Sequence, residues 1–218
     1  MIEAQRSHPD SRTIATRRSF LKKSSLLIAG TAGAQFMLPS TAMGQDARVA
    51  QDIAVLNYTL TLELLESNFY VTGLQRFGAA DFAPLGFATL FDRLRDIRDH
   101  EVTHVNTLTT VVTNLGGTPV SGGSFQFSYS DVRSFLRVAQ VLENTGVAAY
   151  DGALALIKTP QLQTAGATIA TVEARHASFL NFINGDNPFP SATDTPRTPA
   201  DIVAAIQPFV RTAPTLSR

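Results

Sequence analysis

The chain has 218 residues, lacks cysteine and tryptophan, and balances 18 basic against 18 acidic residues. The absence of cysteine excludes a disulfide scaffold, a cysteine nucleophile and an iron–sulfur protein. With 17% charged and 44% hydrophobic residues, the chain is predicted to fold as one domain with a sizeable core rather than to remain disordered. It offers no basic field for nucleic acid.

Residues 1–44 are predicted to be a signal peptide. Residues 16–22, Thr-Arg-Arg-Ser-Phe-Leu-Lys, resemble the twin-arginine export signal, and a weakly apolar run follows at 24–38. This run is shorter than the roughly 20 apolar residues that a membrane-spanning helix needs. Candidate cleavage sites follow Ala42 and Gly44. A retained anchor or a chance Arg-Arg pair is the alternative interpretation.

Removal of this segment changes the charge of the protein. The segment contains six basic and two acidic residues, so the remaining 174 residues carry 12 basic and 16 acidic side chains, a net charge of −4. The twin-arginine route exports folded proteins, which allows a cofactor to be inserted beforehand. We therefore expect a periplasmic or extracellular protein with no stable membrane insertion after processing.

Hydrophobic periodicity predicts four long helices, over residues 47–76, 86–115, 131–158 and 162–184. Each helix carries one mostly apolar stripe with a glutamate near its middle. The stripes comprise Leu56, Leu60, Glu63, Ser67, Tyr70 and Leu74; Leu94, Ile97, Glu101, His104, Leu108, Val111 and Leu115; Leu136, Ala139, Glu143, Val147, Tyr150, Leu154 and Ile157; and Ile169, Glu173, His176, Leu180 and Ile183. The sequence therefore predicts an all-α four-helix bundle over residues 45–186.

The connections between the helices predict their order in the bundle. A loop at 78–84 and the break at Pro160 are short, so each flanking pair of helices is expected to form an antiparallel hairpin. The middle connection, 118–130, contains alternating aromatic residues typical of a short strand. It can reach roughly 45 Å when extended, about the length of a 30-residue helix. A long crossover between two hairpins is predicted, followed by a proline-rich tail, 187–218, with a short helix at about 199–207.

Each half of the predicted bundle carries the same set of polar residues. A glutamate is followed seven residues later by a tyrosine, and the next helix carries Glu-x-x-His. The residues are Glu63, Tyr70, Glu101 and His104 in the first half and Glu143, Tyr150, Glu173 and His176 in the second. Residues at i and i+3 share one face of a helix, and mid-helix positions share one layer of an antiparallel bundle. Six ligand groups are therefore expected to converge.

Four carboxylates at one level of an apolar core require either protons or cations, because an isolated buried charge costs several kcal/mol or more. Two divalent ions would balance the four negative charges. Carboxylates combined with imidazoles suit iron or manganese better than calcium, which takes oxygen ligands. The sequence therefore predicts a two-metal site that holds two Fe ions, or Mn.

Four stretches make the chain resemble the exported branch of the ferritin-like superfamily, which includes desiccation-related proteins. They are residues 62–70, 98–104, 142–150 and 172–176, within a resemblance that covers about 46–211. The resemblance implies ferritin-like connectivity and a di-metal carboxylate site. It also implies that Glu63 and Glu143 are terminal ligands, that Glu101 and Glu173 bridge the metals, and that His104 and His176 each bind one metal.

Several assignments stay open at the level of sequence. Glu66 competes with Glu63 as the ligand of the first helix, but it lies about 60° further round. Tyr70 and Tyr150 are candidate catalytic residues, as ligand-bonding or radical-intercepting groups, or else plain core tyrosines. His100 precedes Glu101, so residues 100–104 also match the HExxH zinc-protease motif. That interpretation lacks a third ligand and leaves the other acidic residues unexplained.

The expected activity is a reaction of the two metals with oxygen or peroxide. Candidate substrates are ferrous iron, peroxide and a small organic molecule, and whether the protein is an enzyme is left open. The alternative function is a non-catalytic, desiccation-related structural bundle. The sequence also leaves open whether the protein forms a homo-oligomer.

Overall fold

The computed structural model describes residues 42–216 of the chain. The predicted signal peptide lies almost wholly outside the described residues, and positions 42–44 belong to the first turn of a helix. Between residues 42 and 216, none of the helices combines the length and the hydropathy that crossing a bilayer requires.

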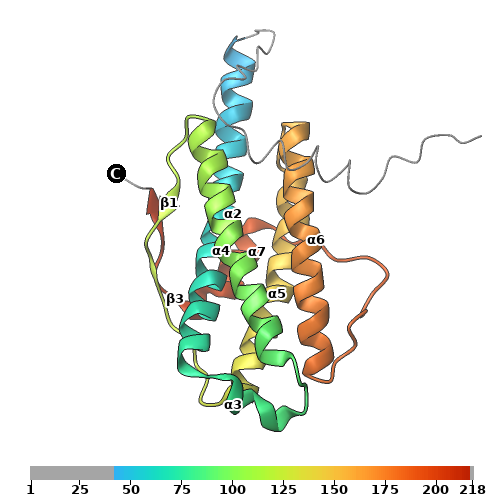
Figure 1. Cartoon of the computed structure of the whole chain (residues 1–218). Helices are drawn as coiled ribbons and strands as arrows, with labels where there is room; N and C mark the ends of the chain where they lie inside the picture. The colour runs from blue at the N-terminus through green and yellow to red at the C-terminus, as the bar shows by residue number, and fades with distance from the viewer. Residues whose placement is uncertain (1–41, 217–218) are drawn as a thin grey trace, which may run out of the picture. The chain divides into compact units, whose positions relative to one another are not determined.

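Four long helices form the bundle: α2 (Ala42–Arg76), α4 (Leu90–Asn114), α5 (Val132–Leu154) and α6 (Pro160–Ile183). The helix α2 packs chiefly against α4, and α5 against α6. The two pairs are antiparallel hairpins, and the chain between them runs the length of the bundle (Figure 1). The predicted all-α bundle with one long crossover is thus confirmed.

Some helix ends differ from the predicted ones, because the residues at the turns favour other conformations. The predicted loop at 78–84 contains a short helix, α3 (Ala79–Phe82), and a 3₁₀ turn, η1 (Ala83–Leu85). The glycine that ends this turn, Gly86, has φ of +82°, so α4 begins at Leu90 and not at 86. The helix α6 begins at Pro160, because proline suits the first helical position.

The third long helix starts as predicted but ends early. The carboxylate of Asp131 accepts a hydrogen bond from the backbone N–H of Ser134 (2.8 Å), which caps α5. The helix ends at Leu154 and not near 158. Beyond it, the buried carboxylate of Asp52 on α2 accepts hydrogen bonds from the backbone N–H groups of Lys158 (2.6 Å) and Thr159 (3.1 Å), which fixes the turn into α6.

The crossover and the C-terminal tail pair with each other. Strand β1 (Val120–Ser121) pairs with β4 (Thr215–Leu216), and β2 (Ser124–Phe125) with β3 (Val210–Thr212), all antiparallel. The strand predicted from alternating aromatics is only partly correct, because Phe127 and Tyr129 lie outside β2. A second 3₁₀ turn, η2 (Gln207–Phe209), precedes β3.

The short helix predicted in the tail is α7 (Pro199–Ile206), and it packs on the bundle. Its Ile202 is fully buried in the core. The tail approaches α5 closely at Gly152, where an added Cβ would lie 2.0 Å from the carbonyl oxygen of Arg197. The Arg197 N–H also donates to the Ala148 carbonyl oxygen (3.1 Å), so backbone contacts help to dock the tail.

The apolar core consists of two clusters. One lies towards the α3 end and includes Phe69, Leu94, Phe135 and Leu180. The other includes Leu60, Leu108 and Ile169. The two clusters lie on either side of the middle of the four long helices. The layer formed by the mid-helix residues is therefore enclosed between two apolar clusters. Six of the predicted inward positions are only partly buried: Ser67, Leu74, Val111, Leu115, Leu154 and Ile183.

Candidate metal centre

Six predicted residues meet in the layer between the two apolar clusters. The four glutamates are each 0% exposed, and the two histidines are 7% and 4% exposed. One glutamate comes from each long helix, and each histidine lies one turn after its glutamate on α4 or α6. We call Glu63, Glu101, His104, Glu143, Glu173 and His176 the six-residue centre.

One half of the centre surrounds His104. Its Nδ1 lies 3.3 Å from Glu63 Oε2, 3.3 Å from Glu101 Oε2 and 3.0 Å from Glu173 Oε1. These four residues each offer a donor atom, and the donor atoms lie within 4.8 Å of one another. Three carboxylate oxygens and one imidazole nitrogen therefore enclose a single position.

The other half surrounds His176 in the same way. Its Nδ1 lies 3.0 Å from Glu101 Oε1, 3.3 Å from Glu143 Oε2 and 3.9 Å from Glu173 Oε2. This group also places its donor atoms within 4.8 Å of one another. Glu101 and Glu173 belong to both halves, and each presents one oxygen to each histidine. That arrangement is what two bridging carboxylates require.

Each tyrosine of the repeated pattern holds the glutamate of the opposite half. The hydroxyl of Tyr70 on α2 donates to Glu143 Oε1 on α5 (2.6 Å), and the hydroxyl of Tyr150 on α5 donates to Glu63 Oε1 on α2. Both tyrosines are buried. The bond occupies one oxygen of each glutamate, and the other oxygen, Oε2, faces a histidine. The tyrosines therefore orient the carboxylates across the bundle.

The electrostatics of the centre are set by burial and by hydrogen bonds. Burial raises the pKa of Glu63 to about 8 despite the hydrogen bond to His104, and raises the pKa of Glu173 well above its usual range. Burial also opposes the charge on Glu101, but hydrogen bonds from both histidines lower its pKa to about 2. Burial disfavours imidazolium, yet hydrogen bonds to Glu101 and other carboxylates raise the pKa of His104 to about 12 and that of His176 to about 10.

His100 contacts the centre from outside. Its Nδ1 lies 2.9 Å from Nε2 of His176, and the two rings stack with centroids 5.2 Å apart. The residue is exposed and belongs to neither donor group found among the described residues. His100 and His104 thus do not share one set of donors, as a zinc-protease motif would require. His100 instead forms a hydrogen bond with Nε2 of His176, and Nδ1 of that ring faces the carboxylates.

The donor atoms of the centre pass a test of fit to metal ions. In the part of the chain between residues 42 and 216, eight buried side-chain polar atoms make no hydrogen bond of normal geometry, and six of them belong to the six-residue centre. They include Oε2 of Glu63 and of Glu143, both oxygens of Glu173 and Nδ1 of His176. Buried polar atoms normally have partners. Cations would satisfy these oxygens and nitrogens together and would neutralise the carboxylates.

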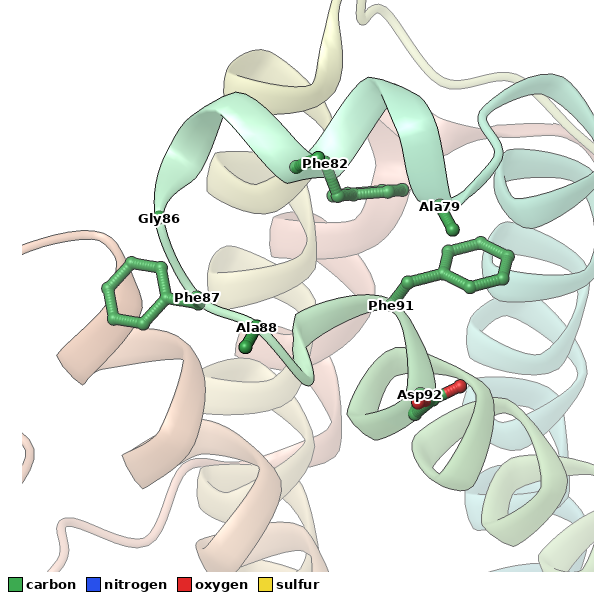
Figure 2. Close-up of a pocket in the computed structure, with 8 residues that line it drawn as sticks. Ala79, Phe82, Gly86, Phe87, Ala88, Phe91 and Asp92 are labelled. Carbon is green, nitrogen blue, oxygen red and sulfur yellow. The ribbon is translucent and has the colours of Figure 1, made fainter.

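A pocket near α3, at one end of the bundle, lies apart from the six-residue centre. Figure 2 shows its lining residues on α3, the following turn and the start of α4, among them Phe82, Phe87 and Phe91; the volume is about 280 Å³. Its one ionisable lining residue is Asp92, and no residue of the six-residue centre lines it. The Phe87 ring meets Phe182 of α6 edge to face, with centroids 6.2 Å apart.

Some buried polar residues were not predicted from the sequence. Asn57 binds the crossover through Thr118 O (3.0 Å) and Val120 N (2.8 Å), and Asp52 binds the turn into α6. Glu66, set aside in favour of Glu63, is also buried, at 3% exposed. It does not enter either donor group, so the geometry favours Glu63 as the residue of α2 that completes the centre.

Comparison with known proteins gives one family. A ferritin-like domain matches residues 51–186, which covers most of the chain and all six residues of the centre. A search of curated proteins finds no match.

Proposed function

The chain belongs to the ferritin-like domain family, and on that premise we propose that it binds two metal ions, iron or manganese, in the six-residue centre and uses them to react with oxygen or peroxide. The observation that carries the proposal is the sharing of Glu101 and Glu173 by two donor groups that otherwise have their own glutamate and histidine. Two positions joined by two carboxylates fit a pair of ions better than a single one.

The donor chemistry supports redox-active ions. Each group supplies three carboxylate oxygens and one imidazole nitrogen, a mixture that suits iron or manganese rather than calcium. Two divalent ions carry four positive charges, which match the four glutamates. When bound, such a pair supplies two electrons to one small oxidant.

The protein's own residues would prepare and hold this centre. Glu101 and Glu173 would serve both metal positions, Glu63 and Glu143 would each serve one position, and the two histidines would serve one position each. Tyr70 and Tyr150 fix the terminal carboxylates by hydrogen bonds, and each also places an oxidisable phenol directly against a ligand. The apolar clusters on both sides exclude bulk water from the layer. Ferrous iron, peroxide or a small organic molecule would be the substrate.

Complete burial of the centre supports a second candidate function. Ions held by residues from all four long helices would brace the bundle whether or not they react. In that case the protein would be a structural, desiccation-related member of the family. The two candidate functions differ in whether the bound metals react. A metal-loaded protein that consumes neither oxygen nor peroxide would therefore have the structural function.

We also propose that the protein is exported, on the evidence of residues 16–22 alone. The substitutions Arg17→Lys and Arg18→Lys together should abolish export of the full chain in a host with the twin-arginine system. Cell fractionation with an antibody measures this. Export of the double variant at the normal level would refute the proposal.

The decisive experiment is metal analysis of the protein purified after expression with its own N-terminal segment. Two equivalents of iron or manganese are expected per chain. The variants Glu101→Ala and His176→Ala should each lose metal, since Glu101 serves both positions and His176 one. Val141→Ala, at a 53% exposed position of α5, is the matched control. Oxygen and peroxide consumption are then measured on the loaded protein. Wild type without stoichiometric metal refutes the proposal.

A further inference from the structure

A fifth buried carboxylate lies beside the six-residue centre. Glu66 follows Glu63 by three residues on α2 and is 3% exposed. Its Oε2 is one of the buried atoms between residues 42 and 216 that lack a hydrogen-bond partner. The charge balance of two divalent ions against four glutamates leaves this residue unexplained.

The two halves of the molecule differ at this position. In the first half, Glu66 lies between Glu63 and Tyr70; in the second half, the equivalent position between Glu143 and Tyr150 is Gly146. The difference is spatially coupled, because a Cβ on Gly146 would lie 3.0 Å from Glu66 Oε1. The side chain of Glu66 therefore uses the space that the glycine leaves open, and a glutamate at both positions would collide.

The atoms around Gly146 indicate which half of the centre Glu66 lies near. The second atom nearest the Gly146 Cβ position is Glu173 Oε2, at 3.5 Å. That oxygen is the one that Glu173 presents to His176, whereas Oε1 faces His104. Glu66 and the His176 half of the centre thus meet at Gly146.

We propose that Glu66 is a seventh metal-binding side chain, which serves the His176 position and makes the two metal positions unequal in affinity. The inference rests on the proposed function, because it requires that two ions bind. The His176 position would gain an additional carboxylate, and the His104 position would not. An extra anionic ligand strengthens binding of a cation, so the His176 position would fill first.

The test is an anaerobic titration of the metal-free protein with Mn²⁺, followed by calorimetry and by metal analysis after equilibrium dialysis. Wild type should bind two ions in two separable steps. Glu66→Gln should weaken the tight step by about 10- to 100-fold, the range typical of losing a supporting metal contact, and leave the weak step within about threefold. Glu63→Gln is the matched control and should weaken the other step.

The variant Glu66→Gln distinguishes a metal-binding carboxylate at position 66 from a protonated carboxyl group that does not bind metal. Glutamine keeps the volume of Glu66 and mimics a protonated carboxyl, so a titration identical to wild type overturns the inference while the proposed function stands. Equal weakening of both steps also overturns it. Wild type that binds no Mn²⁺ overturns both proposals at once.

A second variant keeps the test valid if Glu66→Gln does not fold. Gly146→Ala leaves every carboxylate in the chain but places a methyl group 3.0 Å from Glu66 Oε1. It should weaken the same tight step and leave the other unchanged. Two steps with wild-type affinities in this variant would refute a role for the Glu66–Gly146 contact in metal binding.

Discussion

Metal binding at the six-residue centre should release protons, and the affinity should therefore rise steeply with pH. In the metal-free protein the pKa values of His104 and His176 are about 12 and about 10, because their Nδ1 atoms face carboxylates that outweigh the cost of burial. Both imidazoles are protonated at pH 7. A histidine must lose this proton to bind a metal, so filling both positions releases one proton from each ring.

The size of the effect follows from these pKa values. Each released proton changes the binding constant by about tenfold per pH unit, or about 1.4 kcal/mol. Two imidazolium protons give a change of about 100-fold per unit for the pair of ions. Below pH 8 the proton on Glu63, whose pKa is raised by burial to about 8, makes the dependence steeper, towards about 1,000-fold. Protonation of Glu173, whose pKa burial also raises, adds to this dependence. Above about pH 10 the dependence should weaken, as His176 loses its proton without metal.

The assay is competition with a chelator of known Mn²⁺ affinity at pH 6, 7, 8 and 9, combined with proton release measured by an indicator dye in weakly buffered solution. His176→Gln is the control, since it removes one of the two titrating rings and should release one proton fewer. The reasoning is refuted if metal binds without releasing protons, or if the chelator-corrected affinity is the same at pH 6 and pH 9.

Three further predictions concern the stability of the metal-free bundle. Tyr150→Phe should cost about 1–3 kcal/mol, because it leaves Glu63 Oε1 buried without its donor. Gly73→Ala should cost about 1–3 kcal/mol by overpacking, since the new Cβ would lie 2.1 Å from the ring of Phe135. Ile202→Ala should cost about 2–5 kcal/mol, because this fully buried side chain anchors α7. Urea unfolding measures all three.

Each of these variants has a matched control. Tyr58→Phe removes a buried hydroxyl for which the described residues provide no hydrogen-bond partner, so it should not destabilise. Gly78→Ala adds a Cβ whose nearest neighbour is 4.0 Å away, and Val203→Ala truncates a side chain that is 53% exposed. These two should stay within about 0.5 kcal/mol of wild type. A variant that unfolds no more easily than its control refutes the corresponding packing argument.

The four helices and their order were predictable because their signals are long and local. Each helix carries a stripe of several turns, and the lengths of the connections restrict how the helices pair. The tail was not predictable beyond α7. Strands β1 to β4 have two or three residues each, and such short pairings depend on contacts between the crossover and the chain end that no local pattern encodes.

The burial of Glu66 was also not predictable from its position on the helix. A stripe analysis assigns one buried face to each helix, and Glu66 lies about 60° from the stripe. However, α2 contacts α4, α5 and both strands of the crossover, so a wider face of this helix is covered. Gly146 is the residue that would have drawn attention to Glu66. At this position of the repeated pattern, the first half has a glutamate and the second half has a glycine.

A single antiparallel register between α2 and α5 accounts for the contacts that matter most at the site. In an antiparallel pair, moving seven residues forward on one helix matches moving seven residues back on the other. The equal Glu-to-Tyr spacing of seven in both helices therefore makes the two hydrogen bonds reciprocal: when Tyr150 is level with Glu63, Tyr70 is level with Glu143.

The same register places Glu66 next to Gly146, because moving three residues forward from Glu63 leads to within one residue of that glycine on the facing helix. The tyrosine bonds and the glutamate–glycine contact are thus consequences of one alignment. A one-residue insertion in α2 between Tyr58 and Glu63 would preserve every spacing within the motif and yet rotate it by about 100°. Both tyrosine bonds, the glycine contact and metal binding should then be lost together, and retention of stoichiometric metal binding would refute the argument.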